Sequence, residues 1–351
     1  MPEGNEEKLR ESEFTPEDFD YHLPQELIAQ EALSDRSASR MMVVDRKSGS
    51  VSHKKFRDLS SYLKPDDLIV MNDSKVFPAR LQGLKKLTGG KCEVLLLAKY
   101  EQHESVWTSL CQPKIKPGQI IQFESGLEAN CIGKNNEGYY LLEFNCDDVL
   151  DAASEIGRMP LPNYIKRTAD NKDRDRYQTV YAKNIGSVAA PTAGLHFTPE
   201  IIAELLDQGV KIQYLTLHVG YGTFQPVYDV ERHQMHTECF SISTELADAV
   251  NYTLDNKKKI LAVGSTSTRT LETCAVQGRL HSGTSETDLF IIPPFRFEIV
   301  GSMLTNFHVP KSSLMMLVSA FAGRELILEA YRKAVEERYR FHSYGDAMLI
   351  L

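Results

Sequence analysis

The pattern of apolar and polar residues changes its period within one stretch of the chain, residues 188–227. Apolar residues first recur at the three- and four-residue spacing of a helix, with Thr198 as the helix cap and a glycine at the end. They then alternate with polar residues, as in a half-buried strand that ends near His218. Gly220 and Gly222 follow directly. The stretch therefore predicts a helix, a strand and a glycine turn with a histidine at the end of the strand.

Strand, loop and helix patterns repeat over much of the remaining chain. The expected strands are two around a turn at 47–49, then 66–71, 260–264, 288–292, 303–307 and 347–351. The expected helices are a short one after residue 24, then 244–256, 314–322 and 324–339, and 165–175 is expected to be a charged loop. This order favours an α/β domain with much parallel pairing. Periodicity alone does not separate a distorted barrel from an open doubly wound sheet.

The region from about residue 76 to residue 145 has a different pattern. Short apolar runs recur every 8–14 residues, and turn sequences such as Lys116-Pro117-Gly118 separate them. No helical period is visible between the runs. The region therefore predicts an all-β module, built as a small barrel.

Composition and charge restrict the class of protein. The chain has 351 residues and a net charge of −8, but eight of its acidic side chains lie in residues 1–20, and we expect residues 1–13 to be a disordered acidic tail. No apolar run is long enough for a membrane span, and no signal pattern opens the chain. The six cysteines form no C-x-x-C pair. We therefore expect a cytoplasmic protein with reduced thiols.

Three histidines stand at predicted junctions between a strand and a loop: His196, His218 and His308. Histidine can take and give protons near neutral pH, so three at one topological position indicate acid–base chemistry. Arg269 lies in the hydroxyl-rich segment 264–270, where we expect a loop followed by the first turn of a helix. Hydroxyls, free backbone N–H groups and a guanidinium suit an anion. The alternative is that Arg269 pairs with a neighbouring acid, Glu272 or Asp288.

Two further patterns are weaker. His233, His236 and Glu238 could suggest a metal site, but the spacing is loose and no further ligand supports it, so no metal is predicted. Gly220 and Gly222 form a lone G-x-G, which is not a dinucleotide-binding fingerprint because the third glycine and the opening helix are missing.

Several long sequence blocks are spread from residue 14 to the end of the chain. They are MNDSKVFPARL (71–81), RYQTVYA (176–182), the stretch 188–227, HQMHTE (233–238), GSTSTRTLE (264–272), LTNFHVPKSSLMMLVSAFAG (304–323) and YRFHSYGDAMLI (339–350). Together they resemble the S-adenosylmethionine:tRNA ribosyltransferase-isomerase family of queuosine biosynthesis. The chain departs from the family at three positions, where Tyr221, Pro294 and Gly301 replace an alanine, a glycine and an aspartate.

The resemblance implies a large, distorted α/β barrel-like domain, residues 14–75 and 151–351, with a small all-β barrel inserted at 76–150. It also implies the reaction. The ribosyl part of S-adenosylmethionine moves to the 7-aminomethyl-7-deazaguanine base of tRNA and rearranges to give epoxyqueuosine, while adenine and methionine leave. S-adenosylmethionine is then a substrate, no cofactor is bound permanently, and we expect a monomer. A catalytically silent tRNA-binding protein of the same fold is the alternative.

The candidate site residues follow from these patterns and from the resemblance. The predicted catalytic residues are His196, His218, His308 and Asp346, and the sequence does not assign which is acid and which is base. The predicted substrate-binding residues are Thr192, Gly194, Gly220, Gly222, Thr223, Thr268, Arg269 and Asn306. Basic residues flank the β module on both sides, and we predict that they hold the anticodon arm of tRNA. These residues are Arg80, Lys85, Lys91, Arg158 and Arg176.

Overall fold

The large domain is built on a nine-stranded mixed sheet. A computed structural model describes residues 14–100, 103–224 and 227–351, so the predicted tail 1–13 lies outside the described residues. In spatial order the strands are β17 (Gly283–Thr287), β13 (Glu238–Ile242), β12 (Lys211–Leu217), β3 (Leu68–Asn72), β14 (Ile260–Val263), β18 (Ser302–Asn306), β19 (Ala347–Ile350), β1 (Arg40–Asp45) and β2 (Ser50–Lys55). The central four, β12, β3, β14 and β18, run parallel. Their carboxyl ends therefore meet at one edge of the sheet.

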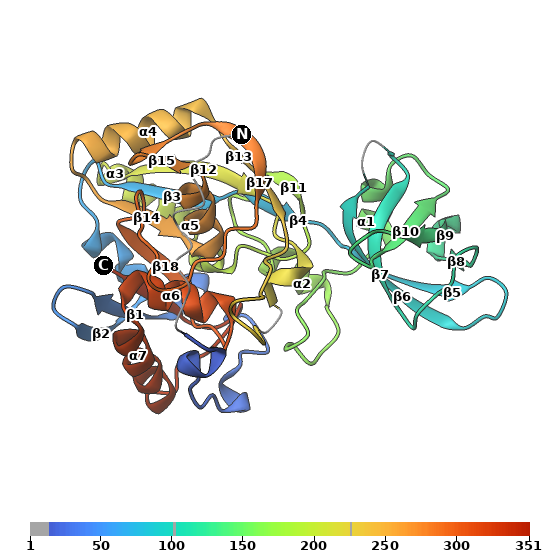
Figure 1. Cartoon of the computed structure of the whole chain (residues 1–351), viewed down its shortest axis with the longest axis horizontal. Coiled ribbons are helices and arrows are strands. Elements are labelled where there is room, and N and C mark those ends of the chain that lie inside the picture. The colour runs from blue at the N-terminus through green and yellow to red at the C-terminus, as the bar shows by residue number, and fades with distance from the viewer. Residues whose placement is uncertain (1–13, 101–102, 225–226) are drawn as a thin grey trace.

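Both faces of β3 and β14, two of the central strands, are buried. In β3, Leu68 and Val70 belong to the core on one face, while Ile69 and Met71 belong to the core on the other. This double burial explains why these strands read as continuous apolar runs rather than as alternating patterns. The helices that accompany the sheet are α3 (Pro199–Asp207), α4 (Thr244–Asp255), α5 (Gly264–Thr273), α6 (Ser313–Ala322) and α7 (Arg324–Glu336). Figure 1 shows α4 at the top of this domain and α7 at its bottom.

A closed six-stranded barrel forms the second lobe, at the right of Figure 1. Around the barrel the strands are β10 (Tyr140–Phe144), β7 (Val106–Gln112), β6 (Lys91–Lys99), β5 (Arg80–Lys85), β8 (Ile120–Gln122) and β9 (Glu128–Lys134). All neighbouring pairs are antiparallel. The barrel has its own apolar core around Trp107 and Leu142. Its strands lie within the interval 76–150 predicted for the inserted domain.

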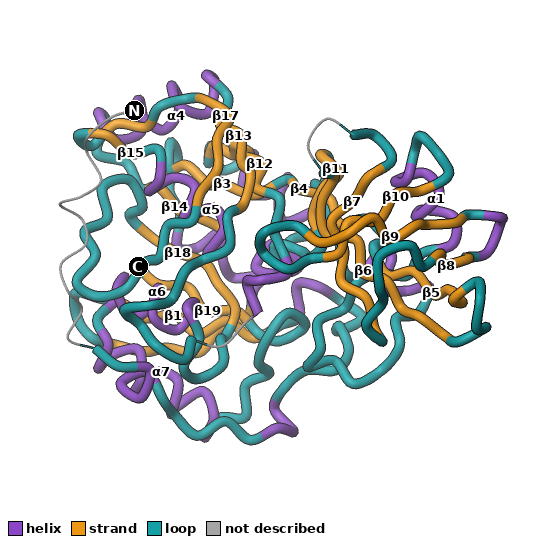
Figure 2. The backbone as a smooth tube through the Cα atoms, turned by 45° about the vertical axis from the view of Figure 1, so that its right-hand side comes forward, coloured by secondary structure: helices purple, strands orange, loops and turns teal. Residues whose placement is uncertain are grey.

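The connection between the two lobes is short. β4 (Ser74–Val76) leads out of the large domain and pairs in parallel with β11 (Asn184–Ser187). On the return path, after α1 (Val149–Ile156), Arg158 forms a β-bridge with Arg80 at the start of the barrel. Figure 2 shows β4 and β11 between the large sheet and the barrel. The α/β class and the inserted all-β barrel are confirmed, and the large sheet stays open between its edge strands β17 and β2.

Some local predictions are confirmed and others are wrong. Thr198 caps α3 as predicted, and Ser312 caps α6. The predicted loop 265–268 is wrong, because α5 begins at Gly264, whose φ of +86° turns the chain directly from strand to helix. The predicted strand 288–292 is also wrong, because the strand is β17, which ends at Thr287. The charged loop contains a short helix, α2 (Asn171–Arg176), which Asp170 caps.

The remaining elements are short. A small hairpin joins β15 (Ala275–Val276) and β16 (Arg279–Leu280). The 3-10 helices lie at Pro16–Phe19, Gln25–Leu27, Arg36–Ala38, Phe56–Tyr62, Glu124–Gly126, Thr192–His196 and Tyr221–Phe224. Within the described ranges, no helix combines the length and the apolar character that crossing a bilayer requires.

Candidate active site

A cavity of about 280 Å³ lies at the carboxyl edge of the parallel strands. Val219 follows β12, the segment Gly264–Thr266 opens α5 directly after β14, and the segment 305–309 ends β18. Ligands of α/β proteins bind at this edge because the loops that leave parallel strands converge there. The lining residues are Ile28, Tyr164, Ala190, Pro191, Thr192, Ala193, Val219, Gly264, Ser265, Thr266, Thr305, Asn306, Phe307, His308, Val309, Ser312, Leu314, His342 and Ser343.

Asn72 fixes the floor below this cavity. It is the last residue of β3, and its amide donates to the carbonyl of Leu217 at 2.9 Å and to the hydroxyl of Thr266 at 3.3 Å. Its side-chain oxygen accepts from the backbone N–H of Leu217 at 3.1 Å. One buried amide thus links the ends of β3 and β12 to the first turn of α5.

The wall of the cavity is largely apolar, and its polar side chains carry no formal charge at neutral pH. Among the described residues that line it, none is Asp, Glu, Lys or Arg. Its polar side chains are hydroxyls, one amide, one phenol and the two imidazoles of His308 and His342. An uncompensated charge is costly away from water, so this wall suits a neutral ligand group with a few hydrogen-bonding atoms.

His308 is the predicted catalytic residue that lines the cavity. Its Nε2 lies 2.9 Å from the Thr305 hydroxyl, and its backbone N–H donates to the hydroxyl of Tyr331 at 3.1 Å. The hydroxyl of Tyr21 donates to its carbonyl, so the residue is fixed on three sides. Burial lowers the pKa of His308 to about 3. The ring is therefore neutral at pH 7.

His196 and Asp346 lie behind the wall. His196 Nδ1 is 2.7 Å from the Ser39 hydroxyl, its Nε2 is 3.2 Å from the amide nitrogen of Asn306, and burial lowers its pKa to about 3. The Asp346 carboxylate accepts from the backbone N–H groups of Arg40 and Arg340, each at 2.8 Å. Burial raises the pKa of Asp346. Both side chains support the strand ends, and Asn306 connects His196 to the cavity.

His218 lies on the other face of β12. The residues of that strand alternate, so Leu217 and Val219 face the core and the cavity while Thr216 and His218 face away. His218 Nδ1 is 2.8 Å from the Ser74 hydroxyl, and its ring lies over Gly186, where an added Cβ would come within 2.6 Å. The structure therefore does not bring the three predicted histidines together.

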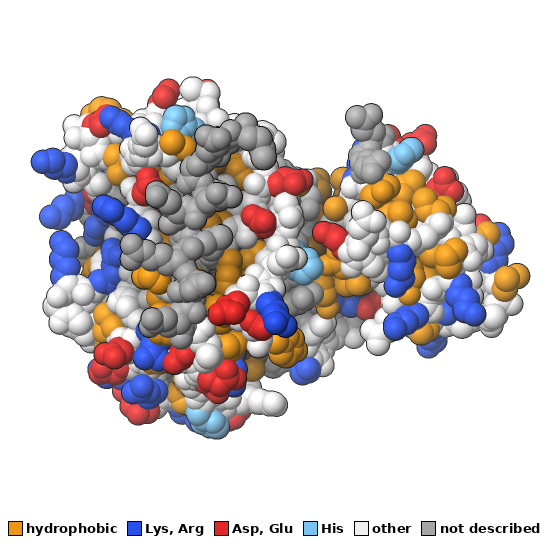
Figure 3. Space-filling model, viewed as in Figure 1, with side chains coloured by type: hydrophobic (Ala, Val, Ile, Leu, Met, Phe, Trp, Pro, Cys, Tyr) orange, Lys and Arg blue, Asp and Glu red, His pale blue; other side chains and the backbone are white. Residues whose placement is uncertain are grey.

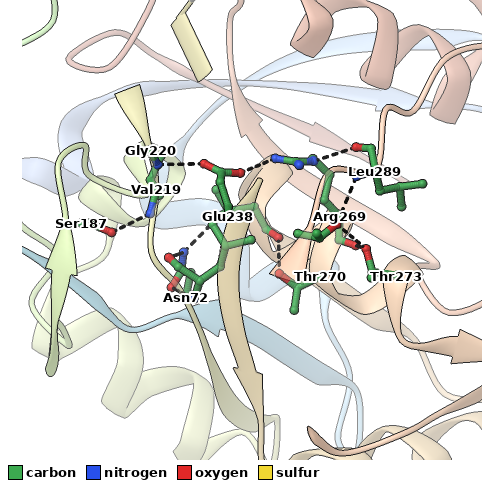
Figure 4. Close-up of polar contacts among 12 residues, drawn as sticks. Asn72, Ser187, Val219, Gly220, Glu238, Arg269, Thr270, Thr273 and Leu289 are labelled. Atoms are coloured by element: carbon green, nitrogen blue, oxygen red, sulfur yellow. Dashed lines mark hydrogen bonds and ion pairs between the residues drawn. The ribbon is translucent and has the colours of Figure 1, made fainter. Parts of the chain in front are cut away.

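Arg269 is part of a buried network (Figure 4). Its guanidinium pairs with Glu238 and donates to the carbonyl of Leu289 at 2.9 Å. The other Glu238 oxygen accepts from the backbone N–H of Gly220 at 2.9 Å. Side chains of both ionic partners are at most 3% exposed. Arg269 thus pairs with Glu238 rather than with Glu272 or Asp288, the two acids that the sequence analysis considers. Glu272 instead accepts hydrogen bonds from three backbone N–H groups of the segment 298–300.

The other predicted substrate-binding residues divide between the wall and the layer behind it. Thr192 and Asn306 line the cavity. Gly194 lies behind the wall, where an added Cβ would meet the Tyr181 hydroxyl at 2.0 Å. Thr268 is buried in α5 and donates to a carbonyl of its own helix at 3.1 Å. Gly222 packs against the ring of His236, and the side chain of Thr223 lies outside the described part of the chain.

The three residues of the weak metal pattern, His233, His236 and Glu238, each make a separate contact. The ring of His233 lies 5.0 Å from that of Phe290, and His236 Nδ1 is 3.4 Å from the hydroxyl of Tyr139. Glu238, the third member of the pattern, pairs with Arg269 instead. In the described ranges, no group of three or more His, Cys, Asp or Glu side chains is placed to hold a metal ion.

The three departures from the family pattern lie outside the cavity wall. The Tyr221 hydroxyl accepts from the Asn163 amide at 3.1 Å, and its side chain packs against the barrel core. Pro294 follows a cis peptide bond, and the carbonyl of Gly301 accepts from Arg46 at 2.6 Å.

The predicted tRNA-binding residues are spread over two regions. Lys91 and Arg158 are exposed, whereas Arg80 pairs with Glu93. The ammonium of Lys85 donates to the carbonyl of Lys114 at 3.1 Å. A cleft of about 320 Å³ at the junction of the lobes is lined by Arg80, Arg158, Lys166 and Arg167, among others. Figure 3 shows basic side chains on the barrel lobe at the right. Arg176 lies elsewhere, in a small cavity of about 20 Å³ beside His196.

His342 is a cavity residue that the sequence analysis does not single out. It lies within the block YRFHSYGDAMLI, where only Asp346 is selected. The candidate histidines are those at the end of a predicted strand, and His342 does not meet that criterion because it precedes β19. A polar residue before a strand that runs antiparallel to its neighbour reaches the same edge of the sheet, and that signal could have found it.

Comparisons with known proteins agree with this architecture. A family model described as "Queuosine biosynthesis protein" matches residues 16–350. Among solved structures, the chain is similar to a crystal structure described as an S-adenosylmethionine tRNA ribosyltransferase from Thermotoga maritima, with 39% sequence identity and a TM-score of 0.56. The match covers 95% of this chain and 100% of that chain. The resemblance seen in the sequence blocks is confirmed.

Proposed function

The chain belongs to the family of queuosine biosynthesis proteins, and we propose that it is an S-adenosylmethionine:tRNA ribosyltransferase-isomerase. In the proposed reaction, the ribosyl part of S-adenosylmethionine is transferred to the 7-aminomethyl-7-deazaguanine base of tRNA and isomerised. The products are epoxyqueuosine in tRNA, adenine and methionine. The description of the Thermotoga maritima relative, which names S-adenosylmethionine and tRNA, supports this assignment.

The observation that carries the proposal is the cavity at the carboxyl edge of β12, β14 and β18. Its volume of about 280 Å³ is near the lower end of the range for small-ligand pockets, about 300–1,000 Å³. We place the adenosine part of S-adenosylmethionine, a substrate, in this cavity, with no permanently bound cofactor. Thr192, Ser265, Thr266 and Asn306 then supply hydrogen-bonding groups for the ribose and the base.

We assign a proton-transfer role in the cavity to His308. Protons on the carbon next to a sulfonium are acidified, and His308 lines the cavity with an imidazole, held by Thr305, that can accept one. His196 and Asp346 support this wall from behind, through Asn306 and the backbone of the strand ends. The catalytic role of His218 stays a prediction, and its position on the opposite face of β12 argues for a structural role.

We propose that the barrel, residues 76–150, and the junction cleft hold the anticodon arm. Lys91 and Arg158 are exposed, which favours contact with phosphates. A modified base in a single-stranded loop can leave its stack at little cost and reach the cavity. We propose that the protein acts as a monomer in the cytoplasm, where precursor tRNA is present.

The test is release of adenine from S-adenosylmethionine, measured with precursor tRNA and without it. We expect adenine and methionine in equal amounts only when the tRNA carries the aminomethyl-deazaguanine base. Release at full rate without tRNA would indicate a nucleosidase instead. Tight tRNA binding without any release would support the catalytically silent protein of the same fold.

A further inference from the structure

Two residues of the cavity wall carry polar atoms that have no hydrogen-bond partner in the described part of the chain. They are the side-chain oxygen of Asn306, Oδ1, and the ring nitrogen of His342, Nε2, and both atoms are buried. Such atoms are rare in native proteins, and each one calls for an explanation such as a bound water or ligand. Because both residues line the same cavity, one ligand in that cavity could satisfy both atoms.

His342 is held in an unusual conformation. Its φ is +67°, a left-handed value that costs free energy for a residue other than glycine and often marks a functional site. Its backbone N–H donates to the carbonyl of Phe307 at 3.0 Å. Its ring stacks on Tyr164, with ring centroids 3.9 Å apart and planes 25° apart. The backbone and the stack together fix the position of the imidazole.

The amide of Asn306 has a defined orientation. Its nitrogen, Nδ2, donates to the carbonyl of His342 at 3.3 Å and to the carbonyl of Asp346 at 3.4 Å. The same nitrogen lies 3.2 Å from Nε2 of His196. Since carbonyl oxygens accept only from the nitrogen side of an amide, Oδ1 must be the free acceptor. The wall therefore offers a fixed acceptor on Asn306 and a fixed imidazole nitrogen on His342.

We propose that Asn306 Oδ1 and His342 Nε2 bind the adenine of S-adenosylmethionine through its hydrogen-bonding edge. The exocyclic amino group of adenine donates to Asn306 Oδ1, and a neighbouring ring nitrogen accepts from Nε2–H of His342. This inference rests on the proposed function and assigns one part of its substrate. Adenine presents the required donor and acceptor side by side on one planar edge.

Charge selects adenine over the other end of the substrate. The methionine part carries an ammonium and a carboxylate, and among the described lining residues no acidic or basic side chain could compensate either one. Adenine is neutral and can be buried without that cost. Burial lowers the pKa of His342 to about 4, so its ring is also neutral at pH 7. The neighbouring titratable side chain in the wall, His308, is neutral as well.

The test measures the affinity of the full-length protein for three bases by calorimetry: adenine, purine and hypoxanthine. Purine lacks the amino group and so tests Asn306 without altering the protein, whereas hypoxanthine replaces that group with an oxygen and carries a hydrogen on N1. We expect adenine to bind about five- to tenfold more tightly than purine, and hypoxanthine to bind more weakly than purine because two acceptors would face each other. Equal binding of adenine and purine would overturn the assignment of Asn306.

Variants test His342. His342→Phe keeps a ring against Tyr164 but removes Nε2, and we expect about a tenfold loss of affinity for adenine and for purine. His342→Gln retains a polar atom at a similar reach and should recover part of that loss. If His342→Phe does not fold, His342→Asn removes the ring with a residue that tolerates the left-handed conformation. The matched control is His281→Phe, an exposed histidine between β16 and β17, which should bind as the wild type does.

Two results would overturn the proposal. One is unchanged adenine affinity in a folded His342→Phe variant. The other is a wild-type protein that binds methionine but not adenine, since the cavity would then hold the charged end. Adenine release from S-adenosylmethionine with precursor tRNA is measured in parallel. If the wild type releases adenine and the His342 variants bind adenine as tightly as the wild type does, only this inference is wrong. If the protein binds adenine specifically but releases none from S-adenosylmethionine, only the proposed function is wrong.

Discussion

The cavity of the large domain and the surface of the inserted barrel present their polar groups in opposite ways. The cavity is lined by apolar side chains together with hydroxyls, an amide and imidazoles, and no charged side chain is among the described residues of the wall. On the barrel, apolar residues such as Trp107 and Leu142 fill the inside, and charged residues such as Lys91 lie outside. The two regions therefore differ in the kind of ligand that their polar groups suit.

This difference follows from the dielectric environment. A neutral hydrogen bond gains strength away from water, whereas an unpaired charge there is expensive, so the cavity suits the uncharged part of a small substrate. Exposed cations gain little from a single contact but act together on a polyanion through the release of its counterions. Substitutions in the two regions should therefore separate catalysis from RNA binding.

The substitution His308→Ala is expected to separate catalysis from tRNA binding most strongly. Loss of a general acid or base typically reduces the rate by about 10²–10⁴-fold, and we expect adenine release to fall by about that factor while tRNA affinity is unchanged. Release is measured with saturating precursor tRNA, and tRNA affinity by filter binding.

His218→Ala is the matched histidine variant on the opposite face of β12. The sequence patterns predict that it abolishes turnover, whereas its contacts with Ser74 and Gly186 predict a loss of stability with turnover largely retained. Normal turnover in His308→Ala together with loss of turnover in a folded His218→Ala would show that the reacting group lies outside the cavity.

A large effect on stability is expected for Glu238→Gln. Removal of one partner from a buried ion pair leaves the other charge uncompensated, which costs about 3–5 kcal/mol of unfolding free energy. The double variant Glu238→Gln, Arg269→Met should recover part of this loss, because it removes both charges. Urea unfolding of each variant gives the comparison. Equal stability of the single variant and the wild type would show that the pair is open to water.

The sequence predicts more of the fold than of the site. The cap at Thr198 acts over three residues, so local sequence is sufficient to predict it. The start of α5 was missed because its serines and threonines favour loops when exposed, whereas here Thr268 and Thr270 donate to carbonyls of their own helix. The faces of β12 depend on register, so a histidine at the strand end could not be assigned to one side.

A smaller effect concerns pH. Burial lowers the pKa of His196 and His308 to about 3, below the value of about 6.5 expected in the unfolded chain. Below about pH 6.5 the unfolded chain takes up protons that the folded chain does not, so stability falls as the pH falls toward 3. Each histidine contributes a slope of about 1.4 kcal/mol per pH unit in this window. Asp346, whose pKa burial raises, acts in the opposite sense.

His308→Gln isolates one of these contributions. Thermal midpoints of the wild type and the variant are compared from pH 7 to pH 5, a window in which the folded histidine stays neutral. We expect the stability of the variant to fall less steeply with decreasing pH than that of the wild type. The difference in slope should correspond to the uptake of about one proton on unfolding. Parallel curves would mean that His308 is accessible to protons in the folded protein.

The smallest effect concerns the salt dependence of tRNA binding, and it tests the barrel directly. Roughly three to five phosphate contacts give a log–log slope of about −2 to −4 for a partly single-stranded target. Lys91→Ala and Arg158→Ala should each reduce the slope by about one unit, because both side chains are exposed. Lys85→Ala should also weaken binding. Arg80→Ala should change it less, since Arg80 already pairs with Glu93.

The matched control for these slopes is Lys54→Ala, an exposed lysine on β2 in the large domain, away from the barrel in Figure 1. It removes the same charge from the protein but should leave the slope unchanged, because counterion release depends on local contacts and not on net charge. Binding of S-adenosylmethionine should be the same in all five proteins, since none of the substituted residues lines the cavity. If Lys54→Ala and Lys91→Ala shift the slope equally, the barrel contributes only to the general field of the protein, and the RNA surface lies elsewhere.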